Sequence, residues 1–393
     1  MPRRVAIVGA ALSDTGRVDD KTNYHLHAQA VQRAVADAGL TKHDVDGFCS
    51  NGLGTLQPID VAEYLGLRPH WVDSTQVGGG TWEVMACHAA DAIAMATPTS
   101  SRARLRIDHP PTLARLPPLN LSYGNRGPVQ YEVAYGHTIA KYAMSTRRHM
   151  YEYGTTLEQL AEDRRRRPLQ RPVQPGRLLP GAAERRRGPQ RPDQGRPVHQ
   201  HQCCIRSDGG CAIVLAAEDR IADCATEPVW VLGHGHAVSH VTMSEWDDFT
   251  TGPAAVAGQQ AFARAGVSPD EMDLACIYDA FTFMEMATLE DLGFCEKGEG
   301  GPFVEDGKLR LGGALPTNPD GGGLSACHPG MRGLFLLVEA TRQLRGDYAG
   351  GTAIAENGEP IPAERQVPNA KLAVASGTGG WFCSNGTLVL GVD

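Results

Sequence analysis

The chain has 393 residues, of which 41% are hydrophobic and 21% charged, and its formal net charge is −8. These values are typical of a globular protein with a large core, and they exclude collagen-like and intrinsically disordered chains. No run approaches the roughly 20 apolar residues that span a bilayer. The start MPRRVAIVGAALSD lacks the long apolar segment of a secretory signal. We therefore expect a cytoplasmic protein with no membrane partner.

The first elements are predicted to be a strand, a helix and a second strand. The apolar run VAIVGAA (5–11) reads as a buried strand, and no G-x-G-x-x-G fingerprint follows it, so a Rossmann fold is not indicated. The segment 30–52 reads as an alanine-rich helix that ends at a capping glycine, then a turn and a strand. The next helix, 81–93, has little polar face, which is expected for a helix inside a layered α/β protein.

Two Arg/Pro-rich stretches, 97–119 and 163–200, interrupt this pattern. Neither has helical or strand periodicity, so both are predicted to be irregular and exposed. Translation of GC-rich DNA in a shifted reading frame would produce this Arg/Pro-rich composition. A genuine disordered basic insert that binds a phosphate group or a partner is the alternative. Basic runs also bind nucleic acid, but these are rich in proline and nearly lack aromatic residues for base stacking, so we expect no nucleic-acid partner.

The second half of the chain repeats the first. The segment 257–279 aligns without a gap on 30–52, with a strand before each copy. Further pairs are a glycine-rich turn leading into an apolar strand (207–220 and 384–393) and a buried helix (81–93 and 331–344). We therefore divide the chain into an N-terminal half, 1–226, which contains both irregular stretches, and a C-terminal half, 227–393.

The ten cysteines do not predict a metal site. No pair has the C-x-x-C spacing that zinc sites favour. In a large protein without a secretory signal, free cysteine most often serves as a small buried hydrophobic residue. We expect no bound metal.

Six motifs together resemble the thiolase superfamily, in the branch related to sterol-carrier-protein thiolases and lipid-transfer-protein homologues. They are SYGNRGPVQYEVAYG (122–136), STRRHMYEYGTT (145–156), HQCCIRSDGG (201–210), IYDAFTFMEMATLEDLGFC (277–295), NPDGGGLSACHPGMRG (318–333) and VASGTGGWFCSNG (374–386). The resemblance implies an α/β thiolase fold, in which two duplicated βαβα-type halves pack as five αβαβα layers. It also implies a homodimer.

The resemblance also shows which family residues are missing. Thiolases carry a nucleophilic cysteine at the start of the first buried helix, where the helix dipole lowers the thiol pKa; this chain has Gly79 there. Cys87 lies two turns further into the helix, where we expect a buried structural residue. Ser376 falls near the place of the second cysteine. Cys327 is an alternative nucleophile, although the family has glycine at that place. The chain is thus most similar to cysteine-less steroid side-chain aldolases.

The family motifs imply the remaining site residues. We expect Tyr278 to be the catalytic acid/base and His328, in the histidine–proline loop, to be catalytic by binding the thioester oxygen. Asp279 is expected to be a structural hydrogen-bond partner. The residues expected to bind the oxyanion or the substrate are Asn318, Gly322, Ser376, Gly377, Gly379 and Gly79.

The implied reaction is retro-aldol cleavage of a β-hydroxyacyl-CoA, with a steroid side-chain thioester as substrate and a short acyl-CoA such as propionyl-CoA as product. No cofactor is expected, because coenzyme A is part of the substrate. The relatives also imply a zinc-ribbon/OB-fold acyl-CoA-binding partner protein. Two alternatives stay open: an acetyl-CoA acyltransferase (a thiolase) with a displaced nucleophile, and a catalytically decayed scaffold subunit of an acyl-CoA enzyme complex.

Overall fold

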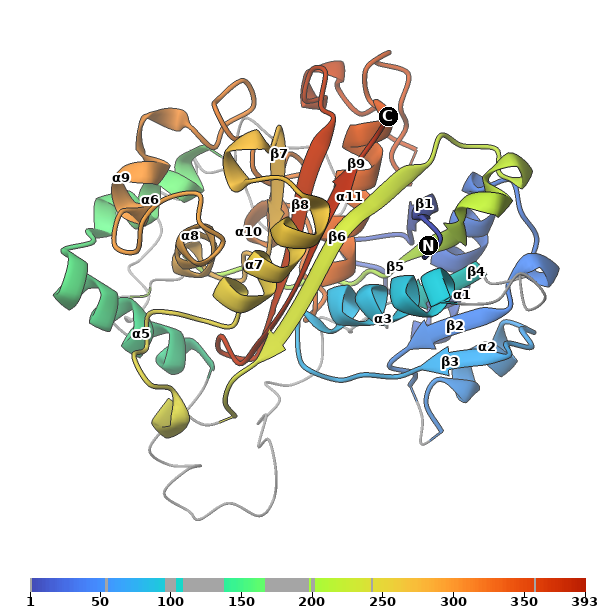
Figure 1. Ribbon diagram of the computed structural model, residues 1–393, viewed down its shortest axis with the longest axis horizontal. Helices are drawn as coiled ribbons and strands as arrows, with labels where there is room; N and C mark the ends of the chain where they lie inside the picture. The colour runs from blue at the N-terminus through green and yellow to red at the C-terminus, as the bar shows by residue number, and fades with distance from the viewer. Residues whose placement is uncertain are drawn as a thin grey trace.

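The computed structural model describes residues 2–53, 56–95, 104–108, 138–166, 198, 202–241, 243–356 and 358–393. The motif at 122–136 lies outside these residues. Figure 1 shows a strongly curled sheet with helices on both sides.

The elements follow the alternation expected from the sequence. Those of the first half are β1 (Val5–Leu12), α1 (Asn23–Asp37), β2 (Gly47–Ser50), α2 (Ile59–Tyr64), β3 (Trp71–Asp73), α3 (Thr81–Met95), β4 (Arg104–Asp108), α5 (Thr138–Tyr153), α6 (Leu157–Arg166) and β5 (Cys211–Ala217). Those of the second half are β6 (Val229–Val238), α7 (Ala254–Ala265), β7 (Leu274–Ile277), α8 (Thr282–Asp291), α9 (Gly300–Val304), α10 (Gly322–Ser325), α11 (Gly333–Arg345), β8 (Leu372–Gly379) and β9 (Ser384–Gly391).

The sheet consists of two half-sheets with equivalent strand orders. Its order is β3-β2-β4-β5-β1-β6-β9-β8-β7, and the halves meet where β1 pairs with β6 through only two residue pairs. Read outward from that junction, β1-β5-β4-β2 corresponds to β6-β9-β8-β7. A single parallel bridge from Thr317 to Ala275 takes the place of β3 beside β7. The internal repeat predicted from the sequence is therefore present in the topology.

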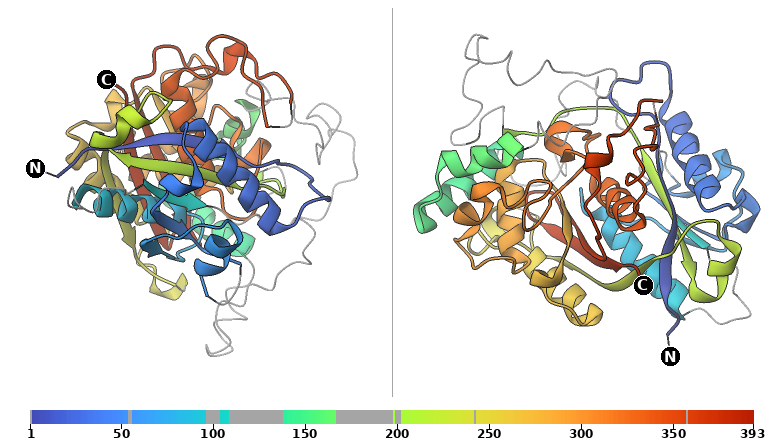
Figure 2. Two further views of the ribbon diagram at one scale, coloured as in Figure 1. Left: turned by 90° about the vertical axis from the view of Figure 1, so that its right-hand side faces the viewer. Right: turned by 90° about the horizontal axis from the view of Figure 1, so that it is seen from above.

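The helices lie in the layers that the thiolase fold requires. On the outside, α1 packs on β1 and β5, and α7 packs on β6 and β9. Between the half-sheets, α3 and α11 contact each other and strands of both halves. The result is a five-layered αβαβα arrangement, as predicted. Helices α5, α6, α8 and α9 gather beside the second half-sheet, away from α1 and α2 (Figure 2).

Local sequence explains why the repeated elements end where they do. Gly39, just after α1, and Gly266, the C-cap of α7, both have φ near +70°, a conformation that glycine adopts without a steric penalty. The central helix α3 is buried on nearly every face, which agrees with its lack of a polar stripe.

The prediction that both Arg/Pro-rich stretches are irregular is wrong where the structure describes them. Residues 104–108 form β4, which pairs in parallel with β2 and antiparallel with β5. The sequence RLRID alternates polar and apolar residues, which is the period of a strand and was obscured by its arginines. The second stretch begins inside α6, and Val198 is buried. The other parts of both stretches lie outside the described residues.

In the part of the chain that the structure describes, no helix is long and apolar enough to cross a membrane. Within the same residues, no three His, Cys, Asp or Glu side chains are grouped so that they could hold a metal ion.

Candidate active site

The candidate site lies where both central helices begin and where β7 and β8 end. Tyr278 follows β7, and its backbone N–H donates to the carbonyl of Ser376 on β8 at 3.0 Å. Gly79 comes two residues before α3. His328 lies in the loop between α10 and α11. The structure thus brings together residues from both halves of the chain.

The phenol of Tyr278 occupies the space in front of Gly79. A Cβ atom added at Gly79 would lie 2.4 Å from Cζ of Tyr278, 2.5 Å from its hydroxyl oxygen and 2.5 Å from the carbonyl oxygen of Thr378. Real Cβ atoms do not approach heavy atoms this closely, so no side chain fits at position 79 while Tyr278 keeps its place. The glycine at position 79 and the tyrosine at position 278 therefore depend on each other, because the Tyr278 ring occupies the space that a side chain at position 79 would need.

Tyr278 is a neutral phenol with one backbone donor. Its side chain is buried, and this burial raises the pKa of Tyr278 well above its ordinary value. The hydroxyl oxygen accepts a hydrogen bond from the backbone N–H of Arg332 at 3.2 Å. The N–H groups of the nearby Gly322 and Gly323 donate to the carboxylates of Asp320 and Asp279.

His328 faces the same phenol with an uncharged ring. The two rings meet edge to face with centroids 5.6 Å apart. Burial, and then the positive charge of Arg332, lower the pKa of His328 to about 4, so the imidazole is neutral at physiological pH. Its backbone N–H donates to Ser207 Oγ at 2.9 Å. Its Nε2 is buried and has no hydrogen-bond partner among the described residues.

A buried ionic group holds the loop that carries His328. Arg332 pairs with Asp320, donates to the carbonyl of Cys327 at 2.7 Å and lies 3.7 Å from Asp279. Asp279 in turn accepts from the backbone N–H groups of Gly323 and Leu324. Asp279 is structural, as predicted. The sequence analysis missed Arg332, because a single arginine before a helix carries no signal that separates it from a surface residue.

Most of the other predicted site residues are engaged by the protein itself. Asn318 is fully buried, accepts from the N–H of Ile277 at 2.9 Å and donates to its carbonyl at 2.8 Å, so it fixes the end of β7 next to Tyr278. Ser376 Oγ lies 2.9 Å from Thr387 Oγ1 on β9. Gly377 and Gly379 are close-packed positions in β8. Their predicted roles in binding substrate stay predictions.

Neither candidate cysteine is an activated thiol. Cys87 is fully buried inside α3, and burial raises the pKa of its thiol. Cys327 is buried with its Sγ 3.1 Å from Ser207 Oγ, and burial raises the pKa of Cys327 to about 11. A nucleophilic cysteine needs a lowered pKa and access to the substrate, so both resemble structural cysteines.

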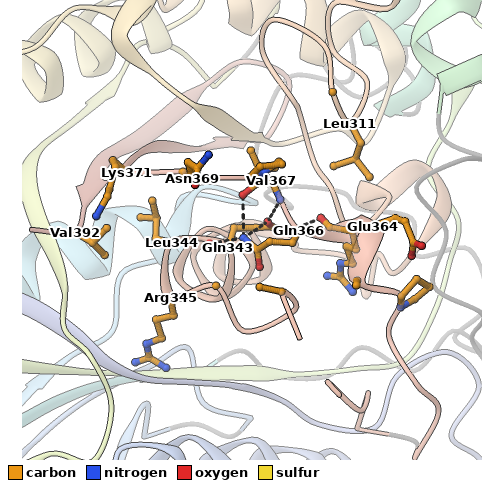
Figure 3. A pocket seen from close by; sticks show the side chains of 18 residues that line it. Leu311, Gln343, Leu344, Arg345, Glu364, Gln366, Val367, Asn369, Lys371 and Val392 are labelled. Atoms are coloured by element: carbon orange, nitrogen blue, oxygen red, sulfur yellow. Dashed lines mark hydrogen bonds between the residues drawn. The ribbon is translucent and has the colours of Figure 1, made fainter. Parts of the chain in front are cut away.

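A separate cavity lies at the C-terminal end of α11. It has a volume of about 890 Å³ and is lined by α11 residues such as Gln343 and Arg345 and by the 362–371 segment (Figure 3). None of the predicted site residues lines it. The polar side chains of its wall bond to one another, as Gln343 does to Gln366 and to the N–H of Val367. It is therefore no part of the Tyr278 site.

Comparison with known proteins identifies the family. The family profile "Thiolase C-terminal domain-like" matches residues 235–392. An acetyl-CoA acetyltransferase of Methanothermobacter thermautotrophicus is 30% identical over 96% of this chain and 97% of its own length. The chain belongs to the thiolase superfamily, in the branch that resembles sterol-carrier-protein thiolases.

Within that superfamily the chain is similar to aldolases. A steroid side-chain-cleaving aldolase of Thermomonospora curvata is 29% identical over 100% of this chain and 99% of its own length. The solved structure of the "Ltp2-ChsH2(DUF35) aldolase" superimposes with a TM-score of 0.82 at 26% identity, and the match covers 100% of this chain and 98% of that one.

Proposed function

We propose that this protein is a lyase of the thiolase fold that cleaves a β-hydroxyacyl-CoA by a retro-aldol reaction. The substrate class is a steroid side-chain thioester, and the product is a short acyl-CoA such as propionyl-CoA. The observation that carries the proposal is the position of the Tyr278 phenol, which fills the space in front of Gly79. An acid/base group thus stands where related thiolases hold their nucleophile.

The reaction needs a proton acceptor and an oxyanion site. Tyr278 first loses its phenol proton to solvent. The phenolate then accepts the proton of the substrate's β-hydroxyl group, and the Cα–Cβ bond breaks as the β-carbon becomes a carbonyl. The electron pair of that bond forms the enolate of the departing acyl-CoA. His328, through Nε2, and nearby backbone N–H groups stabilise the enolate oxygen. Tyr278 then returns the proton to the α-carbon, so no atom is gained or lost and no acyl-enzyme is formed.

The similarity to an acetyl-CoA acetyltransferase favours acyl transfer as the second candidate. That reaction needs a thiolate, and the pKa of Cys327 is raised to about 11 by burial. Mass spectrometry after incubation with an acyl-CoA separates the two reactions. The aldolase stays unmodified, whereas a thiolase gains one acyl group on cysteine.

We further propose that the protein works as a cytoplasmic homodimer together with a small acyl-CoA-binding partner of the zinc-ribbon/OB-fold type. Support comes from the similar aldolase of known structure, whose name Ltp2-ChsH2(DUF35) includes a second component. Coenzyme A enters only as part of the substrate, so no separate cofactor is required.

The direct test is incubation with a steroid-type β-hydroxyacyl-CoA, with and without such a partner. We expect propionyl-CoA and the matching steroid ketone in equal amounts, measured by liquid chromatography with mass spectrometry. Consumption of free CoA, or release of acetyl-CoA from acetoacetyl-CoA, would instead identify a thiolase.

A further inference from the structure

A buried carboxyl group lies inside the central helix layer, close to the candidate site. Glu83 is in the first turn of α3 and has no exposed surface. Neither of its carboxyl oxygens has a hydrogen-bond partner among the described residues. A buried carboxylate without a partner destabilises a protein, so such a group is unusual unless the function requires it.

Three glycines make room for this carboxyl group, and we call them the glycine cluster: Gly333 at the start of α11, Gly377 in β8 and Gly386 in β9. A Cβ atom added at Gly333 or Gly377 would lie 2.1 Å from Oε2 of Glu83, and one at Gly386 would lie 2.7 Å from its Cβ. Any larger residue at these places would collide with Glu83. The surroundings therefore fix the carboxyl group in one place.

The glycine cluster places Glu83 next to the immediate neighbours of Tyr278. Gly333 follows Arg332, whose N–H donates to the phenol oxygen, and Gly377 follows Ser376, which accepts from the N–H of Tyr278. The added Cβ of Gly333 would also lie 2.6 Å from the carbonyl oxygen of Gly79, the residue that contacts the phenol ring. The carboxyl and the phenol thus lie against the same short stretches of backbone.

Among the described residues, few other charges face Glu83. Tyr278, just after β7, and Cys87, one turn further along α3, are titratable groups whose pKa the charge of Glu83 raises. Arg332, the N-cap residue of α11, is a cation, but its guanidinium is held by Asp320 and by the carbonyl of Cys327. The residues of β8 and β9 that adjoin Glu83 are Gly377 and Gly386, which have no side chain to ionise.

We propose that Glu83 is a positioning residue for Tyr278, in that the charge on its carboxyl group sets how readily the phenol gives up its proton. This inference rests on the proposed aldolase reaction. A negative charge at Glu83 disfavours a phenolate nearby, because like charges repel strongly where water is excluded. The neutral acid removes that repulsion. Glu83 therefore acts through Tyr278 and does not touch the substrate.

The sign of the expected pH dependence follows from the burial of Glu83. Burial raises the pKa of Glu83 to about 8. A phenol acts as a base only in its phenolate form, so the rate should first rise with pH. As the pH passes about 8, the Glu83 carboxylate forms and raises the phenol pKa, which offsets part of that rise. The wild-type profile should therefore flatten near this pH, and the flattening should belong to Glu83.

The test is the pH profile of kcat/KM for the wild type and for Glu83→Gln, between about pH 6 and pH 10, with the steroid-type β-hydroxyacyl-CoA as substrate. We expect the two values to be alike below about pH 8 and the Glu83→Gln value to exceed that of the wild type by about tenfold above it, the effect of one unit of phenol pKa. Only the wild-type profile should flatten near this pH. Glu83→Leu, if it folds, should behave alike.

The matched control is Asp91→Asn, which makes the same chemical change at an exposed position of α3. Its profile should follow the wild type. A Glu83→Gln profile that runs parallel to the wild type would overturn the inference, because a structural role changes the rate equally at every pH.

A second readout does not depend on turnover. Difference infrared spectroscopy should show a protonated carboxyl band that titrates near neutral pH in the wild type and is missing in Glu83→Gln. A wild type without that band overturns the inference. If the band titrates and no acyl-CoA is cleaved, the proposed function fails and the unusual state of Glu83 stands.

Discussion

The two central helices each carry a buried glutamate, and the two differ in their partners. Glu339 in α11 accepts hydrogen bonds from Arg365, from Tyr348 at 3.0 Å and from Gln343 at 2.9 Å. Glu83 in α3 has none among the described residues. A paired buried carboxylate holds elements in place, whereas an unpaired one stays titratable near neutral pH. The two central helices, which hold these glutamates at different positions along their length, thus differ in whether the buried carboxyl group is paired.

The loops before these helices differ in the same way. The chain enters α3 through Gly78, Gly79 and Gly80. Gly79 leaves space for the Tyr278 ring, and the other two pack against the backbone of residues 377–380. It enters α11 through a segment that supplies His328 and the N–H of Arg332. The first half of the repeat provides the space for the Tyr278 ring, and the second half provides His328 and the backbone N–H that donates to the phenol. Either loop alone would not make a site.

The largest effect is expected from Tyr278→Phe, which keeps the ring against Gly79 and removes only the hydroxyl group. If Tyr278 is the acid/base, turnover falls by roughly 10²–10⁴-fold while KM changes little. Steady-state kinetics on the β-hydroxyacyl-CoA measure this. Circular dichroism should show unchanged folding.

Near-wild-type turnover in Tyr278→Phe would show that the ring acts only as a wall of the pocket. His328→Gln would then be the next variant, because His328 Nε2 faces the same phenol and has no partner among the described residues.

The next largest effect is expected on the stability of the protein when Glu339, the paired glutamate, is replaced. Glu339→Gln leaves Arg365 charged in a buried place without its carboxylate, so we expect a loss of about 3–5 kcal/mol in the free energy of unfolding. Urea denaturation at neutral pH measures it. The neighbouring Glu364→Gln is exposed and should change stability by less than about 0.5 kcal/mol. Equal effects of the two variants would contradict the comparison.

Glu83→Gln should change the free energy of unfolding in the opposite direction to Glu339→Gln, and the size of this change should depend on pH. The pKa of Glu83 is raised from 4.5 to about 8 on folding, so the native state holds this proton more tightly than the unfolded chain. Wild-type stability relative to Glu83→Gln is therefore highest below about pH 4.5 and is lost as the pH rises toward 8. We expect the variant to be more stable than the wild type by a few kcal/mol at high pH. Melting temperatures across the pH range test this.

Much of the fold was readable in the sequence. The repeat of 30–52 at 257–279 predicted the outer helices α1 and α7 and the strands β2 and β7 that follow them. It could do so because both copies keep the same hydrophobic period and the same capping glycine. The central helices were recognised from their lack of a polar face. The strand β4 was not, since two arginines in five residues outweighed the period of two.

The site was readable only in part. The family motifs located Gly79, Tyr278 and His328, and the structure brings these three together. They did not show that Tyr278 fills the space at Gly79, because that contact joins residues about 200 positions apart. Glu83 was missed because a glutamate in a helix usually faces solvent. Its burial depends on three glycines from three other elements.

A smaller effect is expected from Gly79→Ala. The added methyl group must displace the Tyr278 ring and presses on the backbone carbonyl of Thr378, which cannot move away as a side chain can. We expect a loss of about 1–3 kcal/mol in stability and reduced turnover. In a double-mutant cycle with Tyr278→Ala, the cost of the methyl group should fall without vanishing. Gly350→Ala, where the added Cβ finds only Thr352 Oγ1 at 3.4 Å, is the matched control.

The smallest effect is expected from Cys87→Ala, which tests whether any cysteine of α3 takes part in the reaction. The Sγ atom of Cys87 lies 3.8 Å from the carbonyl oxygen of Gly235 on β6, on the side of the helix that packs on the second half-sheet. Burial raises the pKa of its thiol, so no thiolate is present at neutral pH. Turnover should therefore stay at the wild-type value, with a loss of about 1 kcal/mol in stability from the missing sulfur. If turnover fell further than the folded fraction measured in the same sample, the reaction would involve a cysteine, and Gly79 would no longer mark the loss of covalent chemistry.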